Sequence, residues 1–99
     1  MRTADQEQGM AAGIETLLGR TVVLDTAGST LYLGQLTGCE HDGFWLEQAD
    51  VHNTIEGHAT REQYILEAAR DGVRVNRHRV FVFCHTVISV SALDEVLKD

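Results

Sequence analysis

Several features are missing from this chain of 99 residues, and each absence narrows the possibilities. Proline is absent, so nothing rigid marks a linker, and the length suggests one small domain. No run of 18 apolar residues occurs, which argues against a transmembrane helix. The opening segment MRTADQEQGM lacks the positive start and apolar core of a signal peptide. We therefore expect a cytoplasmic protein whose two cysteines stay reduced.

Basic side chains are scarce. Lys and Arg number 8 against 15 Asp and Glu, which gives a formal net charge of −7. This balance argues against broad phosphate binding, which depends on cations. The local exception is VRVNRHR, residues 73–79, where Arg74, Arg77 and Arg79 cluster. Clustered arginines can hold phosphate, but they more often form a solvated face or pair with carboxylates.

Apolar periodicity divides the chain into short elements. Residues 1–9 are expected to be a flexible tail, ahead of a single domain over residues 10–99 that opens with a helix over residues 10–18. A second helix is predicted over residues 60–71, where Thr60 and Gln63 form a T-x-x-Q capping box. Five strands are expected, over residues 21–26, 30–39, 44–54, 73–83 and 87–93.

The order of these elements indicates a mainly β fold. It predicts a small, strongly bent five-stranded antiparallel barrel with an N-terminal helix and a helix inserted between strands three and four. Gly34, inside the second strand, indicates a sharp bend or a bulge. The third and fourth strands are expected to pair as a long hairpin, with the inserted helix closing its tip. That helix carries an apolar stripe: Tyr64, Ile65, Ala68 and Ala69. The stripe needs cover, either from the helix's own hairpin or from another subunit.

Four segments follow one another in an order typical of one family. A helix ending in LLGR leads into TVVL, and AGSTLYLGQL follows, with Gly34 at its bend and Leu36 entering the core. FWLEQAD comes next, and VFVFCHTVISVS completes the series. From about Ile14 to Leu93 this series resembles the Sm-like (LSm) family, in a divergent bacterial-type form. The resemblance implies a strongly bent five-stranded barrel, in agreement with the element order.

The resemblance also implies self-assembly. In Sm-like proteins the fourth strand of one subunit pairs with the fifth strand of the next, commonly in rings of six or seven. The apolar fourth and fifth strands agree with this, because an exposed apolar edge invites pairing and a head-to-tail contact closes into a ring. The predicted interface consists of Val80, Phe81, Val82, Phe83, Val87, Ile88 and Val90.

The RNA clamp of the family is altered in this chain. Its usual Arg-Gly pair, between strands four and five, aligns with Phe83 and Cys84, so the cation is missing. Its other loop reads CEHDGFW, with Glu40 in place of the usual Asp and Asp42 or Gly43 in place of the usual Asn. The residues predicted to contact RNA are therefore Arg74, Arg77, Arg79, Glu40, Asp42, Phe83 and Cys84.

Metal binding and catalysis have little support in the sequence. Cys39 and His41 flank one turn, and Cys84 and His85 form another that lies nearby in an Sm-like barrel, which suits zinc if all four converge. No paired C-x-x-C spacing supports that convergence, so it stays open. Adjacency of Cys84 and His85 is not the geometry of a thiol enzyme. No glycine-rich phosphate loop occurs either. We expect no enzyme activity and no cofactor.

Two functions follow from this reasoning. The first is a non-enzymatic module that self-assembles and serves as an RNA-associated scaffold with an atypical RNA site. The second is a protein assembly scaffold without nucleic acid, with partners docking on the helix over residues 60–71; the net charge and the altered clamp favour it. The aromatic run at Phe44 and Trp45 fits a core strand with one partly exposed ring better than a base-stacking surface.

Overall fold

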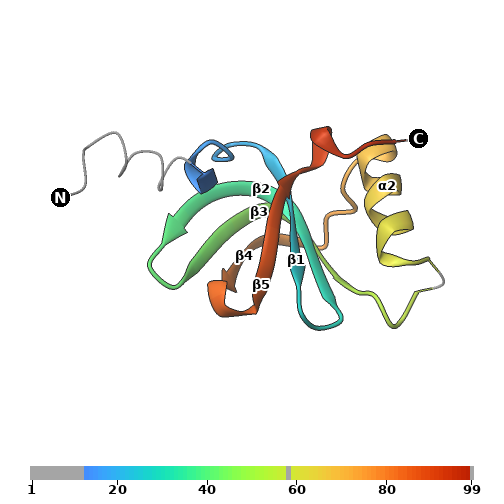
Figure 1. Cartoon of the computed structure of the whole chain (residues 1–99), viewed down its shortest axis with the longest axis horizontal. Helices are drawn as coiled ribbons and strands as arrows, with labels where there is room; N and C mark the ends of the chain where they lie inside the picture. Colours follow the sequence, from blue (N-terminus) through green and yellow to red (C-terminus); the bar gives the residue numbers. More distant parts are fainter. Residues whose placement is uncertain (1–12, 58, 99) are drawn as a thin grey trace.

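Five strands and one regular helix make up most of the chain (Figure 1). The computed structural model describes residues 13–57 and 59–98; within them, residues 13–15 are helical and residues 16–19 form turns. The predicted tail and the start of the predicted first helix lie outside the described residues. In order, the elements are β1 (Thr21–Thr26), β2 (Thr30–Glu40), β3 (Gly43–Asn53), α2 (Arg61–Asp71), β4 (Arg77–Phe83), the 3-10 turn η1 (Cys84–Thr86), β5 (Val87–Ala92) and the 3-10 turn η2 (Leu93–Glu95).

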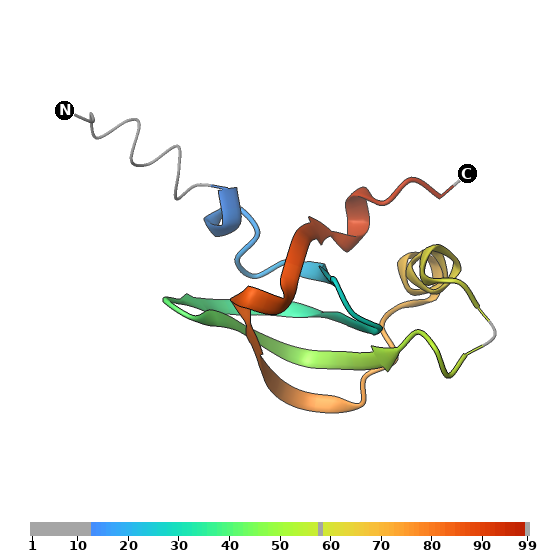
Figure 2. The same ribbon diagram turned by 60° about the horizontal axis from the view of Figure 1, so that its bottom comes forward.

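All five strands pair antiparallel in one sheet, in the order β4-β3-β2-β1-β5. The mainly β fold and the helix inserted between β3 and β4 are as predicted, but the sheet does not close, which corrects the expected barrel. The cause is that β5 pairs with β1 from Val22↔Ala92 to Thr26↔Val87, so only η1 joins it to β4. Figures 1 and 2 show the two edge strands meeting at η1 and diverging from there.

The β2–β3 hairpin curves the sheet. Its register shifts by one residue between Leu33 and Gln35 and again between Leu36 and Gly38. Such bulges bend a strand and increase its twist. Gly34 lies at the first shift, where a Cβ atom would come within 3.1 Å of Ala49. A side chain at the predicted bend would therefore force the neighbouring strand to move by a few tenths of an ångström.

The fourth strand is shorter than the sequence predicts. It was expected to begin at residue 73, but it begins at Arg77, and the four residues before it form a connection. The side chain of Asn76 explains the difference: its Nδ2 donates to the carbonyl oxygen of Val51 at 3.1 Å, and its Oδ1 accepts from the Val51 N–H at 3.0 Å. A side chain thus replaces the strand ladder there, and Arg74 lies beside α2 instead of on the strand.

Two apolar clusters lie on opposite faces of the sheet, as the alternation of neighbouring strand residues requires. The inner cluster lies within the curve of the sheet and consists of Val22, Leu24, Leu36, Leu46, Ala49 and Val82. The outer cluster lies between the sheet and α2 and consists of Val23, Leu31, Leu33, Ile65, Ala68 and Leu93. The apolar stripe of α2 therefore finds its cover within its own chain, mainly on β1, β2 and η2, and not on the β3–β4 hairpin that was one of the two expected covers.

Helix α2 begins where the sequence places it. The Oγ1 of Thr60 accepts a hydrogen bond from the N–H of Gln63, whose side chain accepts one from the N–H of Thr60, which completes the capping box. Arg61 then fastens the helix to the β1–β2 turn: it pairs with Asp25 and donates to the carbonyl oxygen of Gly28 at 2.8 Å. Within the described ranges no helix is long and apolar enough to cross a membrane.

Candidate functional site

The two turns that carry the altered clamp meet at one end of the sheet. The backbone N–H of Cys84, at the start of η1, donates to the carbonyl oxygen of Asp42 in the β2–β3 turn at 2.9 Å. Gly43 leaves no room for a side chain, because a Cβ atom there would lie 2.4 Å from the carbonyl oxygen of Val82. The structure thus brings Asp42 and Cys84 together, beside the 53% exposed ring of Phe83.

Glu40, another predicted RNA contact, is engaged within the chain. Its Oε2 accepts a hydrogen bond from the Nε1 of Trp45 at 3.0 Å. The two rings of the aromatic run divide as expected, since Phe44 packs against the inner cluster while Trp45 is partly exposed on the other face. The carboxylate of Glu40 therefore serves to orient the Trp45 ring.

A row of planar side chains runs from Trp45 along β4. Trp45 and Phe81 meet edge to face, with ring centroids 4.9 Å apart, and Phe81 and Phe83 do the same at 5.3 Å. The ring of His85 follows at 6.0 Å from Phe83. The guanidinium of Arg79 lies over the Trp45 ring, 3.9 Å from its centroid. We call Trp45, Arg79, Phe81 and Phe83 the outer-face stripe.

Sequence reasoning did not foresee this stripe as a unit, since it assigned Phe81 and Phe83 to the oligomer interface. The contact between Trp45 and Phe81 depends on the register of β3 against β4, in which these two residues stand opposite each other. The available signal was the spacing of Arg79, Phe81 and Phe83 at every second position, which places them on one face of a strand. The two valines between them pack against the inner cluster.

The three arginines predicted to contact RNA do not form a single patch. Arg79 lies on the Trp45 ring, and Arg77 is exposed at the start of β4. Arg74 lies apart from both, with its Nη2 3.9 Å from the Oε2 of Glu67 on α2. The predicted cluster is therefore split between the sheet and the helix.

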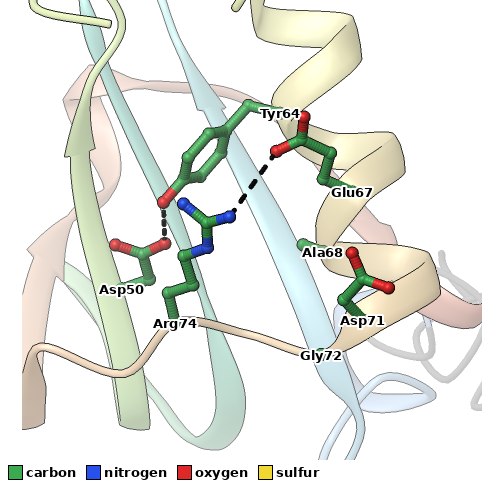
Figure 3. Close-up of a pocket in the computed structure, with 7 residues that line it drawn as sticks. All are labelled: Asp50, Tyr64, Glu67, Ala68, Asp71, Gly72 and Arg74. Carbon is green, nitrogen blue, oxygen red and sulfur yellow. Dashed lines mark hydrogen bonds and ion pairs between the residues drawn. The ribbon is translucent and has the colours of Figure 1, made fainter.

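A small polar pocket between α2 and β3 contains this Arg74–Glu67 pair (Figure 3). Within it, the Tyr64 hydroxyl donates to the Oδ2 of Asp50, and the Nδ2 of Asn76 donates to the Oδ1 of Asp50 at 3.0 Å. Asp50 is only 2% exposed, so the two donors satisfy a buried carboxylate. Burial, together with the Asp50 carboxylate, raises the pKa of Tyr64 to about 12. With a volume of about 10 Å³, the pocket has room for one water at most, so we assign it a structural role.

The β5 edge borders a larger apolar groove of about 520 Å³. Ile14 and Leu17, ahead of β1, line one side of it, and Phe44 contributes from β3. Ile88, on β5 itself, is 66% exposed beside this groove. Two other predicted interface residues, Phe81 and Phe83, belong to the outer-face stripe. The remaining ones pack against or within the inner cluster: Val80, Val82, Val87 and Val90.

The residues considered for a metal do not form a metal site. In the part of the chain that the structure describes, no group of three or more His, Cys, Asp or Glu side chains is placed to hold a metal ion. Cys39, His41, Cys84 and His85 therefore do not converge. Both cysteines are free and exposed.

Comparison with known proteins relates the chain to one architecture. The sequence matches no family model and no curated protein. The structure is similar to that of the Pyrococcus abyssii Sm protein in complex with a uridine heptamer, with a TM-score of 0.57 and 15% identity over 83% of this chain and 94% of that chain. The fold is that of an Sm protein. The resemblance read from the sequence is therefore confirmed for the fold, and the divergent bacterial-type form stays a prediction.

Proposed function

We propose that this chain is a non-enzymatic Sm-like module that self-assembles through its two sheet edges and acts as an RNA-associated scaffold. The observation that carries the proposal is the strand order, in which β4 and β5 end the sheet without pairing with each other. Each edge strand presents one large exposed apolar side chain, Phe83 on β4 and Ile88 on β5. Edges of this kind are templates for pairing with another chain.

Pairing β4 of one copy with β5 of the next is a head-to-tail contact. Such a contact repeats by rotation and closes into a ring, for which six or seven subunits is the expectation from the family resemblance. A neighbouring β4 would also cover the groove beside β5, where Ile14, Leu17 and Phe44 are otherwise open to water. In the assembly, a strand from the neighbouring copy would then complete the barrel that the single chain leaves open.

The proposed RNA site lies where the β2–β3 turn meets η1. The Sm protein of the same fold was solved in complex with a uridine heptamer, which supports RNA association for this chain. The site is atypical because Phe83 and Cys84 stand where the family has its Arg-Gly pair. Contact with a base would rest on stacking against the exposed Phe83 ring instead of on a cation. We place the assembly in the cytoplasm.

The second candidate function is a protein assembly scaffold that binds no nucleic acid. Two observations favour it: the net charge is −7, and two of the predicted RNA contacts already face carboxylates or donors of their own chain. Arg74 lies beside Glu67, and Glu40 accepts from Trp45. Under this alternative the exposed face of α2, which includes Glu67, is the partner surface.

Light scattering tests self-assembly when a variant of the β5 edge is compared with a matched control. Ile88→Arg places a charge on that edge, whereas Ile55→Arg changes an isoleucine in the segment after β3 that is at least as exposed, at 77% against 66%. We expect a defined oligomer for the wild type and for Ile55→Arg, and smaller species for Ile88→Arg. A monomeric wild type at all concentrations would overturn self-assembly.

RNA association is tested on the same samples. Short uridine-rich or adenine-rich RNA should increase the mass of the oligomer at low salt, and the increase should weaken only modestly as salt rises, because the proposed contact is mainly stacking. An oligomer whose mass does not respond to either RNA at low salt would reject RNA association and leave the protein scaffold as the function.

A further inference from the structure

The outer face of the sheet is covered over only half its width. Helix α2 and η2 pack over β1 and β2 through the outer cluster. Over β3, α2 reaches Asp50 and His52 near the end of the strand, and the rest of β3 and β4 carries the outer-face stripe, none of whose members belongs to either cluster. In Figures 1 and 2, α2 stands beside one end of the sheet and leaves the end at η1 uncovered. Burial in the core therefore does not account for these aromatic side chains.

The centre of the stripe is held in place by several contacts. The guanidinium carbon of Arg79 lies over the Trp45 ring, 3.9 Å from its centroid, and Glu40 accepts a hydrogen bond from the ring nitrogen at 3.0 Å. Phe81 meets the ring at 63°, and Gly38 of β2 lies beside it, where a Cβ atom would be in ordinary van der Waals contact with Cδ1. A surface fixed in this way loses little conformational freedom when a ligand binds.

We propose that the outer-face stripe binds single-stranded RNA by stacking its bases on the Arg79–Trp45 pair and on Phe81. This inference rests on the proposed RNA association and adds a contact surface away from the turns. Guanidinium planes and aromatic rings are the groups on which unpaired bases stack in proteins. Phe83 touches Phe81 on one side and stands beside η1 on the other. An RNA strand that leaves the two turns would therefore continue along β4.

The charges of this face favour bases over phosphates as the main contact. Arg79 stands opposite Glu47 across the β3–β4 pair, and Glu40 lies at the edge of the Trp45 ring. The two carboxylates thus offset the charge of Arg79 locally. Binding should therefore depend little on salt, since the salt dependence reports the number of phosphates that cations neutralise. A protein anchor is the less fitting occupant, because such anchors insert into pockets and this surface is the flat face of a sheet.

Fluorescence of Trp45 tests the proposal directly because it is the only tryptophan in the chain. The full chain is titrated with octamers of adenosine and of uridine, and with an abasic ribose-phosphate octamer as the probe for phosphate contact alone. We expect the base-bearing octamers to quench the emission and the abasic octamer to leave it unchanged. Affinity should fall by less than about tenfold between about 50 and 200 mM salt, as for one or two neutralised phosphates.

Two variants test whether the RNA contacts the outer-face stripe. Arg79→Gln and Phe81→Leu keep the tryptophan and lie outside the clusters, and each should weaken binding about 5- to 100-fold, the effect of losing one stacked base. The matched control is Arg70→Gln, on the last turn of α2, where the arginine donates to the carbonyl oxygen of Lys98; it should bind like the wild type. Thermal melting and light scattering confirm that each variant folds and assembles.

The possible failures are distinguishable. Wild-type affinity for the octamers in both stripe variants would overturn the stripe and leave RNA association at the turns intact. An oligomer that binds no octamer at all would overturn the stripe together with RNA association, while self-assembly stands. Quenching by a lysine-rich amphipathic peptide in the absence of any response to RNA would assign the surface to a protein partner and overturn the proposal.

Discussion

Removing the hydroxyl of Tyr64 should destabilise the chain by depriving a buried carboxylate of a donor. Asp50 is 2% exposed and accepts from Tyr64 on one oxygen and from Asn76 on the other. Tyr64→Phe keeps the ring and its stack on His52, with centroids 3.7 Å apart, but removes the donor to Oδ2. Leaving a buried acceptor unpaired costs about 1–3 kcal/mol, so we expect the free energy of unfolding to fall by about 2 kcal/mol at neutral pH.

The same hydroxyl makes this stabilisation depend on pH. Burial and the Asp50 carboxylate raise the pKa of Tyr64 to about 12 in the folded chain, against about 10 for an unfolded one. Because the folded state holds the phenol proton more tightly, the contribution is complete below about pH 10 and is lost as the pH rises toward 12. Two pKa units correspond to at most about 2.7 kcal/mol, and solvent screening of the partly exposed ring lowers this to about 1–2 kcal/mol.

Urea unfolding at one protein concentration, from about pH 7 to about pH 11, measures both effects. The control is Tyr32→Phe, which changes a tyrosine packed against the inner cluster. The stability difference between the wild type and Tyr64→Phe should shrink above about pH 10, while Tyr32→Phe follows the wild type. If Tyr64→Phe is as stable as the wild type and its curve runs parallel throughout, the Tyr64–Asp50 hydrogen bond contributes nothing and the reasoning is refuted.

Three other substitutions test how the sheet and helix are held. Gly43→Ala should lower stability by about 3 kcal/mol through overpacking, because its Cβ would lie 2.4 Å from a carbonyl oxygen of β4. The control is Gly28→Ala, whose Cβ meets nothing within 4 Å; equal melting temperatures for the two variants would contradict this. Arg61→Met should cost about 1–2 kcal/mol through loss of the pair with Asp25, seen as faster hydrogen exchange in α2, and unchanged exchange would count against that anchor. Thr60→Ala should cost about 1 kcal/mol in the same melts, and no change would dismiss the cap.

Features fixed by neighbouring residues could be predicted from the sequence, and features fixed by distant ones could not. The start of α2 depends on Thr60 and Gln63, three positions apart, and it was predicted. The start of β4 depends on Asn76, whose side chain binds the backbone of Val51, 25 positions away. The open sheet likewise depends on β5 pairing with β1 and not with β4, which no local pattern reveals.

The candidate site divides in the same way. The family resemblance placed Asp42 and Cys84 at two turns that meet, and the structure joins them by a backbone hydrogen bond. The role of Glu40 could not be predicted, because it depends on the ring nitrogen of Trp45 reaching that carboxylate across the β2–β3 hairpin. Alignment to a motif assigns a residue to a position, whereas its hydrogen-bond partner depends on the register of the strands.

The two proposed uses of β4 are compatible because they involve different directions of the same strand. Its free backbone groups lie in the plane of the sheet, toward a neighbouring copy, while Arg79 and Phe81 project perpendicular to the sheet. Pairing with β5 of another subunit therefore leaves the stripe exposed and repeats it once per subunit. An RNA long enough to reach two stripes would then bind more tightly than an octamer, since the second contact is intramolecular. The smaller species formed by Ile88→Arg should accordingly bind an octamer as tightly as the wild type does. They should lose the extra affinity for the longer RNA, because that gain in avidity requires two stripes in one assembly.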